Sequence, residues 1–481
     1  MGGGAHSGRI VKRTMGSACR SFLSSRFLSR REVLRVGGLA GFGLSLPGVL
    51  RAREIAVAPK ADGNLAATFG KAKHVIVLYL HGGHPQQETF DPKPEGPAEL
   101  RGEFGAIASS LAGVQVSELL PRTATIMHKL ATVRSMSHRH TDHVIASMPA
   151  LTGHPHPPEK DKLGDFPPSP TDYPPHGAVL SAIRPAQGGL PTWMRVGPLM
   201  RRMNGTVLHG QSPGLLGNRH ASFVVDQELL PADVRIEAVQ PIADLTELRL
   251  TARLDLLKQV DRQQRLIDQS AGVRTFDEYY QRAFNLIGSA ATHKAFRLAD
   301  ESPEMRARYG KTEFGQRCLL ARRLAEAGVP MTYVSYCHTP AGSWDTHSNH
   351  FPQMKKSLAP TFDSAFTALV NDLDERGMLD ETLVIAMAEF GRTPQINKSG
   401  GRDHWPFVYS VAFAGAGIRA GTVYGSSDSA AAYPASDPRG PADFCATVYH
   451  LLGVPPDTAI HDQQGRPHNI IIGEPIAPIL A

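Results

Sequence analysis

Short apolar runs recur along the chain, and each ends in polar or glycine residues. Four of them lie at residues 74–80, 331–336, 383–388 and 408–414, and residues 131–135 predict a further short strand. Runs of this length are too short for ordinary helices and are typical of strands buried on both faces of a sheet. The pattern therefore predicts a mostly parallel sheet inside the protein.

Segments with helical spacing of apolar residues alternate with these runs. The strongest covers residues 314–327 and ends at Gly328, a helix-stop signal. The same spacing predicts four more helices, at residues 245–268, 279–298, 362–376 and 442–452. Strands that alternate with helices predict an α/β domain, in which neighbouring strand ends lie on one edge of the sheet.

Potential metal ligands follow two of the predicted strands. Glu389 ends one strand, and Asp403 and His404 follow it after a polar loop that contains glycine. Asp345 and His347 follow another strand, at a spacing of two that lets both side chains face one cation. Ligands bind at the carboxyl ends of strands in open α/β sheets, so we expect these side chains to converge there.

Histidines are concentrated near two other predicted strands. His81 opens a glycine-rich turn directly after the first strand, and five histidines lie within residues 135–158. Among the five, His143 has three open roles, as a metal ligand, a general acid or base, or a nucleophile that accepts a phosphoryl group. His350 and Thr141 are further candidates, as a ligand and a nucleophile respectively.

Arg392 follows the Glu389 strand and is the candidate for binding an anion. Its planar guanidinium could hold two oxygens of a phosphate or sulfate at once. A surface salt bridge is the competing interpretation of the same residue. We expect Arg392 to act in catalysis together with His143.

The donor types restrict the metal. Carboxylate and imidazole donors without thiolate suit Zn²⁺, Mn²⁺ or Fe²⁺ better than Ca²⁺ or Mg²⁺, and we favour Zn²⁺ or Mn²⁺. The four cysteines, Cys19, Cys318, Cys337 and Cys445, are widely spaced and form no CxxC pair. Neither a thiolate zinc site nor a disulfide framework is therefore indicated.

The positive charge of the chain is concentrated at its N-terminus. Of the net charge of +6, residues 1–57 carry +8, from ten basic and two acidic residues, so the remainder carries −2. A nearly neutral domain gains little from releasing counterions of a polyanion, which argues against nucleic acid as a partner. With 41% apolar residues in 481, the rest of the chain can build a large core.

The N-terminal segment has the pattern of an export signal. Arg30 and Arg31 precede a mildly apolar, glycine-rich run that ends at Leu50. This run is at the short end for a bilayer span, which needs about 20 apolar residues. We therefore expect a twin-arginine (Tat) signal with a linker at residues 1–57, recognition by the Tat machinery, and a periplasmic or secreted protein without a stable membrane span.

Several motifs together resemble one bacterial family. They include HVIVLYLHGG from residue 74, LTGH from 151, WDTH from 344, AEFGRTP from 388 and GRDHWP from 401. The chain resembles the family called domain of unknown function 1501 (DUF1501), which is grouped with sulfatases and alkaline phosphatases. The resemblance implies an alkaline phosphatase/sulfatase-like three-layer α/β sandwich with a mostly parallel central sheet, formed by residues 58–481, with an irregular insertion at about 155–300.

The chain departs from the wider superfamily at its implied metal ligands. Relatives end the first strand in a metal-binding Asp, where this sequence has His81, and Glu88 or Asp91 are candidates to compensate. The position of the modified nucleophile of sulfatases falls on His143, which is neither Cys nor Ser, and this argues against a formylglycine mechanism. The later strand ends in Glu-Phe where relatives have Asp-His, and His404 is the candidate to supply the missing imidazole.

Two functions follow from this resemblance and the candidate ligands. The first is an exported hydrolase of sulfate or phosphate esters, small molecules or glycans, which uses one or two metal ions and either metal-activated water or His143 as the nucleophile. The alternative is a catalytically inactive protein that binds a glycan or another anion on the same scaffold. A purely structural role in the cell envelope is a third possibility.

Overall fold

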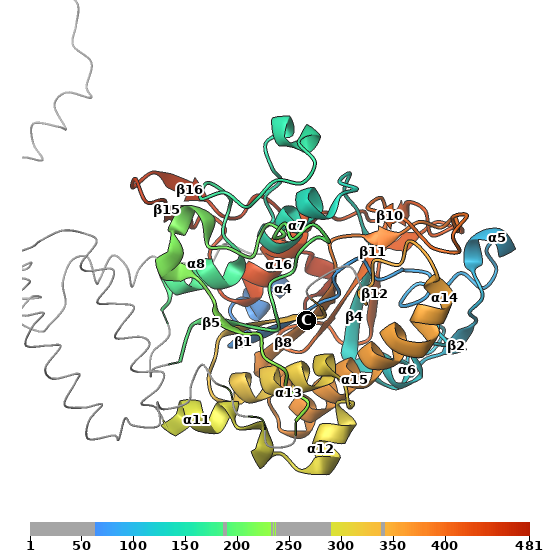
Figure 1. The fold of residues 1–481 in the computed structure, drawn as a ribbon, viewed down its shortest axis with the longest axis horizontal. Coiled ribbons are helices and arrows are strands. Elements are labelled where there is room, and N and C mark those ends of the chain that lie inside the picture. Colours follow the sequence, from blue (N-terminus) through green and yellow to red (C-terminus); the bar gives the residue numbers. More distant parts are fainter. Residues whose placement is uncertain (1–62, 186–189, 232–233, 235, 237–289, 338–341) are drawn as a thin grey trace, which may run out of the picture. The chain divides into compact units, whose positions relative to one another are not determined.

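A computed structural model describes residues 63–185, 190–231, 234, 236, 290–337 and 342–481 (Figure 1). The predicted export signal, the predicted helix at 245–268 and most of the one at 279–298 lie outside the described residues. The described helix α11 covers Ala290–Phe296. Among the described residues, no helix is long and apolar enough to cross a bilayer.

The core of the fold is an eight-stranded sheet in the order β12-β4-β11-β8-β1-β7-β5-β6. Its strands are β1 (His74–Tyr79), β4 (Leu130–Met136), β5 (Trp193–Val196), β6 (Phe223–Val225), β7 (Met331–Ser335), β8 (Thr382–Met387), β11 (Tyr409–Ala414) and β12 (Thr422–Tyr424). All five predicted strands are present. Strand β11 runs antiparallel to β4 and β8, and the other pairings are parallel.

Helices cover both faces of the sheet (Figure 1). The alternating side chains of β1 accordingly belong to two apolar clusters. Ile76 and Leu78 belong to one apolar cluster, with residues of α6 (Pro121–Ile126), α13 (Glu313–Glu326) and α15 (Ala359–Glu375). Val75 and Val77 belong to the other, with residues of α7 (His143–Thr152), α8 (His176–Ile183) and α16 (Pro441–Leu451). The three-layer α/β arrangement is therefore confirmed.

Shorter elements join these layers. They are α4 (Gly63–Thr68), α5 (Ala98–Arg101), α12 (Pro303–Arg308), α14 (His350–Gln353), and the small ladders β2 (Ala106–Ala108) with β3 (Gln115–Ser117), β9 (Gly391–Arg392) with β10 (His404–Trp405), β13 (Ser426–Ser427) with β14 (Pro434–Ser436), and β15 (Ala459–His461) with β16 (Pro467–Asn469). The Pro- and Gly-rich insertion also supplies β5 and β6, which extend the sheet beyond β7.

A buried arginine links two helices of one layer. The side chain of Arg322 in α13 is fully buried. Its guanidinium lies 2.7 Å from Glu301, 2.6 Å from Glu326 and 2.8 Å from Asp372 of α15. Asp372 also accepts hydrogen bonds from the hydroxyl of Tyr309, at 2.9 Å, and from Nε of Arg376, at 2.7 Å. Removing one partner of such a group leaves the other charge buried and poorly compensated.

We predict that Arg322→Leu lowers the free energy of unfolding by about 3–5 kcal/mol, because Asp372 then lies in the interior with Arg376 as its remaining ion-pair partner among the described residues. Arg308→Leu is the matched control, since Arg308 pairs with Glu375 at the surface and such pairs contribute about 1 kcal/mol or less. Urea unfolding followed by circular dichroism measures both values. Equal losses in the two variants would contradict the assigned role of Arg322.

Candidate metal centre

Residues that directly follow three strands of the central sheet form the site. Strand β1 lies between β7 and β8 and pairs in parallel with both, so the residues that follow these three strands lie on one edge of the sheet. The loops are also bonded to one another. The N–H of Trp344 donates to the carbonyl of His81 at 3.0 Å, and the N–H of Gly82 donates to Glu389 at 3.0 Å.

Gly82 allows this close approach. Its φ of 107° lies in the region that favours glycine, and a Cβ at this position would lie 2.2 Å from the backbone nitrogen of Asp345. Any larger residue would therefore push the Asp345 loop away from β1. The glycine after the first strand is thus a packing requirement of the site.

Helix α7 brings His143 into the centre of these strand ends. The side chain of Asp142 caps the helix by accepting from the N–H of Val144, so the helix begins at His143. His143 is 1% exposed, so its side chain is buried in the site and is not bonded to solvent at the start of the helix. His138 lies just before the helix and contacts the carbonyl of Glu389 at 2.7 Å, which fixes the end of β8.

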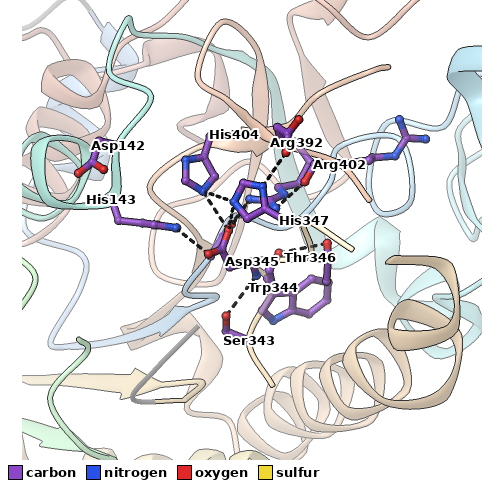
Figure 2. Close-up of polar contacts among 12 residues, drawn as sticks. Asp142, His143, Ser343, Trp344, Asp345, Thr346, His347, Arg392, Arg402 and His404 are labelled. Carbon is purple, nitrogen blue, oxygen red and sulfur yellow. Dashed lines mark hydrogen bonds and ion pairs between the residues drawn. The ribbon is translucent and has the colours of Figure 1, made fainter. Parts of the chain in front are cut away.

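A continuous chain of polar contacts joins five residues of the site, and Figure 2 shows the part of it between His143, Asp345, His347 and His404. Nδ1 of His143 lies 2.6 Å from Oε1 of Glu389, and Nε2 lies 3.1 Å from Oδ2 of Asp345. The other oxygen of Asp345, Oδ1, lies 2.9 Å from Nε2 of His404 and 3.0 Å from Nε2 of His347. The structure thus brings together all five residues, although they come from distant parts of the chain.

The contacts of the Nδ1 atoms define the tautomers of His347 and His404. Nδ1 of His404 lies 2.6 Å from the carbonyl oxygen of Thr141, and Nδ1 of His347 lies 2.6 Å from Oδ1 of Asp403. Both partners are acceptors, so both Nδ1 atoms carry hydrogen. In the neutral rings the Nε2 atoms are then lone-pair acceptors, and they lie 2.9 Å from each other and beside Oδ1 of Asp345. Such a cluster of acceptors is stable only with a cation among them, either an additional proton or a metal ion.

His81 supplies a second, deeper group of ligands. Its side chain is fully buried, and within the described part of the chain neither of its ring nitrogens has a hydrogen-bond partner. Ligand atoms of His81, His143 and Glu389 lie within 4.8 Å of one another, as do those of His143, Asp345 and His404. His143 therefore belongs to both groups. Unpartnered buried nitrogens beside a carboxylate fit a metal site.

The protonation of the centre follows from burial and from these contacts. Burial lowers the pKa of His81 and of His404 to about 4, so both are neutral near pH 7. Burial also acts to lower the pKa of His143, but hydrogen bonds to Asp345 and Glu389 outweigh it and raise the pKa to about 9. In the metal-free arrangement His143 therefore carries a proton between two carboxylates, and a divalent cation would displace that positive charge.

Arg392 holds the loops of the site through hydrogen bonds. It is fully buried, and it donates to Asp345 at 2.9 Å, to the carbonyl of Gly82 at 3.0 Å and to the carbonyl of Arg402 at 2.6 Å. Its guanidinium is committed to protein oxygens, which favours a positioning role over the anion-binding role expected from the sequence. The competing interpretation, a surface salt bridge, is wrong because the side chain is not at the surface.

Two acidic residues that were candidates to replace the missing ligand are paired elsewhere. Glu88 lies 2.5 Å from the guanidinium of Arg402 and 3.5 Å from His350, and Asp91 lies 3.0 Å from Lys93. Neither belongs to a ligand group of the described residues. His350, expected within reach of the metal, instead contacts Glu88. These expectations are wrong because Arg402 and Lys93 already pair with the two carboxylates.

Asp403 takes a different position from that of a direct ligand. Its side chain is 51% exposed and contacts Nδ1 of His347, the nitrogen that faces away from Asp345. A carboxylate in this position fixes the tautomer and orientation of a ligating histidine. Asp403 thus acts on the centre through His347.

An open pocket lies over the exposed side of the centre. It has a volume of about 330 Å³ and is lined by Asp165, Arg202, Met203, Asn204, Asp345, His347 and His404. The first four residues come from the Pro- and Gly-rich insertion and were not identified from the sequence, because they belong to no motif. The ring of His404 is also stacked on that of Phe390, with the ring centres 4.5 Å apart.

Comparison with protein families gives a match over most of the chain. A family model described as "Protein of unknown function (DUF1501)" matches residues 72–480. None of the curated proteins matches the chain.

Several solved structures are similar to this one at low identity. The sulfatase PsFucS1 from Pseudoalteromonas sp. is 14% identical, with 90% of this chain and 75% of that chain covered and a TM-score of 0.35. The phosphonate monoester hydrolase SpPMH from Silicibacter pomeroyi is 12% identical, with 75% and 71% covered and a TM-score of 0.36. A protein in the alkaline phosphatase superfamily from Vibrio parahaemolyticus is 13% identical, with 90% and 78% covered and a TM-score of 0.36.

We predict an acid-sensitive contribution from Glu88. Burial acts to raise its pKa, but Arg402 and His350 more than offset this, so the pKa lies below its ordinary value of 4.5. The ion pair therefore stabilises the protein fully above about pH 4.5 and is lost as the pH falls through the lower pKa of the folded state. At pH 6, Glu88→Gln should cost about 3 kcal/mol of unfolding free energy.

Urea unfolding of metal-free wild type and Glu88→Gln at several pH values measures this contribution. The difference between the two proteins should shrink steadily below about pH 4.5, because the unfolded wild type takes up a proton at Glu88 near that pH and the folded protein follows at its lower pKa. A difference that stays constant down to pH 3 would contradict the assigned ion pair.

Proposed function

Because this chain belongs to the DUF1501 family, whose members are described as proteins of unknown function, we propose its activity from its own site: it is a metal-dependent hydrolase of phosphate or sulfate esters. The observation that carries the proposal is the meeting of three acceptor atoms, Nε2 of His347, Nε2 of His404 and Oδ1 of Asp345, at the floor of an open pocket. A cation at this point would face the pocket directly.

The donors fit a first-row transition metal. His81, His143 and Glu389 would hold one ion, and Asp345, His347 and His404 would hold another. His143 would serve only one of the two ions, because a neutral imidazole has a single lone pair to give. All donors are nitrogen or carboxylate oxygen, which suits Zn²⁺ or Mn²⁺. When bound there, such an ion supplies Lewis acidity toward an ester oxygen and lowers the pKa of water.

The surrounding residues orient the donors and bind the substrate. Asp403 and the carbonyl of Thr141 hold the rings of His347 and His404, and Arg392 holds Asp345. At the pocket wall, Arg202 presents a cation to an anionic ester while its own position is fixed by Asp142, at 3.0 Å. The pocket volume of about 330 Å³ lies at the small end of ligand sites, which favours the head of a small or terminal ester.

The choice of nucleophile favours water. Both nitrogens of His143 are occupied by carboxylates, and the described residues that line the pocket include no Ser, Thr or Cys. A covalent intermediate on a side chain therefore has less support than direct attack by water. The same observation supports the alternative function, a binding protein that holds a glycan or another anion without turnover.

The N-terminal segment, residues 1–57, adds a cellular location to the proposal. Arg30 and Arg31 with the apolar run after them support export by the twin-arginine machinery, which carries folded proteins with their metals in place. The hydrolase would then act in the periplasm or outside the cell.

We predict that the purified protein binds one or two equivalents of transition metal at this centre and hydrolyses p-nitrophenyl phosphate or p-nitrophenyl sulfate. Asp345→Ala should bind less metal, and its kcat/KM should fall by at least about 10²-fold. The reason is that it removes the oxygen that Nε2 of His347 and Nε2 of His404 both face. Glu381→Gln, at an exposed ion pair with Lys73, is the control and should leave both properties unchanged. Elemental analysis and steady-state kinetics measure them.

The two proposed functions differ in these measurements. Metal binding with no turnover on either ester, together with retained anion binding after metal removal, would replace the hydrolase by the binding protein. A wild-type protein that takes up no metal, and whose melting temperature does not respond to Zn²⁺ or Mn²⁺, would contradict the metal centre itself.

We also predict that Asp403→Asn weakens metal affinity by about 10- to 100-fold without removing a ligand, because it loosens the tautomer and orientation of His347. Competition with a chromophoric chelator measures the affinity. Asn397→Ala is a milder companion, since Asn397 donates to Asp403 at 3.1 Å, and it should have a smaller effect in the same direction. Unchanged affinity in Asp403→Asn would show that His347 is not a ligand.

A further inference from the structure

A second cluster of metal-binding residue types lies in the insertion, apart from the donors described above. It consists of His156, Asp172 and His209, whose side chains are 3%, 2% and 0% exposed. Their potential ligand atoms all lie within 4.8 Å of one another. None of the three residues belongs to a sequence motif, and none takes part in the proposed hydrolysis.

His156 lacks the contacts that a buried histidine normally has. Within the described part of the chain, neither of its ring nitrogens has a hydrogen-bond partner. Its ring meets that of His209 edge to face, with the centres 4.5 Å apart, and meets Phe166 in the same way. A buried imidazole without partners is costly, so these nitrogens indicate a ligand that completes the site.

His209 faces acceptors on both sides. Its Nε2 lies 3.0 Å from the carbonyl oxygen of Phe166, and its Nδ1 lies 2.7 Å from Oδ2 of Asp172. A neutral ring can donate to only one of them. If Nε2 donates to the carbonyl, as in many histidines that bind metals, the lone pair of Nδ1 points toward Asp172. That pair of acceptors then needs a cation, either a proton on His209 or a metal ion.

From these contacts we propose that His156, Asp172 and His209 form a structural site for a divalent metal of the Zn²⁺ type, separate from the hydrolytic centre. Two imidazoles and a carboxylate are a donor set that Zn²⁺ prefers. Among the described residues, the competing cation beside Asp172 is Lys160, whose Nζ lies 3.8 Å from Oδ1 of Asp172. That distance is long for an ion pair, and it involves the carboxylate oxygen that does not face His209.

The position of this second cluster shows what a metal ion bound there would hold together. His209 directly follows a turn at residues 200–208, in which Arg202 and Thr206 are hydrogen-bonded through their backbones at 2.8 Å. This turn carries Arg202, Met203 and Asn204, which line the pocket over the hydrolytic centre. Asp172 lies in the other segment of the insertion that supplies a pocket residue, Asp165. A metal ion would therefore fasten together the two segments that form the pocket wall.

The test compares bound Zn²⁺ in the full-length folded protein and in two variants. His156→Phe keeps a ring of similar size but removes a ligand, and it should bind one equivalent less than wild type. His154→Phe is the matched control. His154 is a buried neighbour that contacts the carbonyl of Ile470 at 3.1 Å and belongs to no ligand group of the described residues. This variant should bind as much Zn²⁺ as wild type.

Amide hydrogen exchange provides a second readout that is independent of ester hydrolysis. Residues 200–208 should exchange faster in His156→Phe than in wild type with Zn²⁺, because the turn loses its attachment. Equal Zn²⁺ content and equal exchange in both proteins would overturn the proposal and assign the cluster to a protonated His209 alone. If His156→Phe does not fold, an anomalous difference map of Zn²⁺-loaded wild type decides, with a peak among the three side chains expected and its absence contradictory.

Discussion

The site depends on one oxygen atom, Oδ1 of Asp345, which collects more polar partners than a carboxylate oxygen normally has. Nε2 of His347, Nε2 of His404 and the guanidinium of Arg392 all lie within 3.0 Å of it. Arg392 donates, but the two histidines have already used their Nδ1 hydrogens on other acceptors. A cation among these atoms resolves the repulsion between lone pairs, and the rest of the site holds the acceptors in place.

The order of strands makes this concentration possible. Because β1 lies between β7 and β8, the loops after the three strands are in contact, and Gly82 lets the backbone of one loop touch that of another. The buried guanidinium groups of Arg392 and Arg402 then bond to carbonyls and carboxylates of these loops. The cost of burying so many charged groups is offset only because each has a partner.

The sequence predicted the strands and the residues at their ends because both follow local rules. A short apolar run specifies a buried strand, and polar residues just after it, such as Glu389 and Asp345, fall at the edge where ligands bind. The role of Arg392 could not be predicted in this way. Whether a guanidinium faces substrate or protein depends on which carbonyls the folded loops bring beside it, here those of Gly82 and Arg402.

The pocket wall and the second cluster were also beyond prediction. Arg202, Asp172 and His209 lie in a Pro- and Gly-rich segment without periodicity, and their proximity arises only from tertiary packing. His156 belongs to the histidine-rich stretch at residues 135–158, but the other members of its cluster, Asp172 and His209, come from other segments of the insertion. Ligand sets assembled from irregular structure leave little signal in one sequence, whereas ligands at strand ends do.

The most direct test of the central claim is an anomalous difference map from a crystal of the protein grown with Zn²⁺ or Mn²⁺. A metal peak should lie about 2.0–2.2 Å from Nε2 of His347, Nε2 of His404 and Oδ1 of Asp345, with these atoms spread apart around it. A map with no peak, in which the same atoms keep their separations of 2.9 and 3.0 Å, would contradict it, because a proton would then be the only cation the site requires.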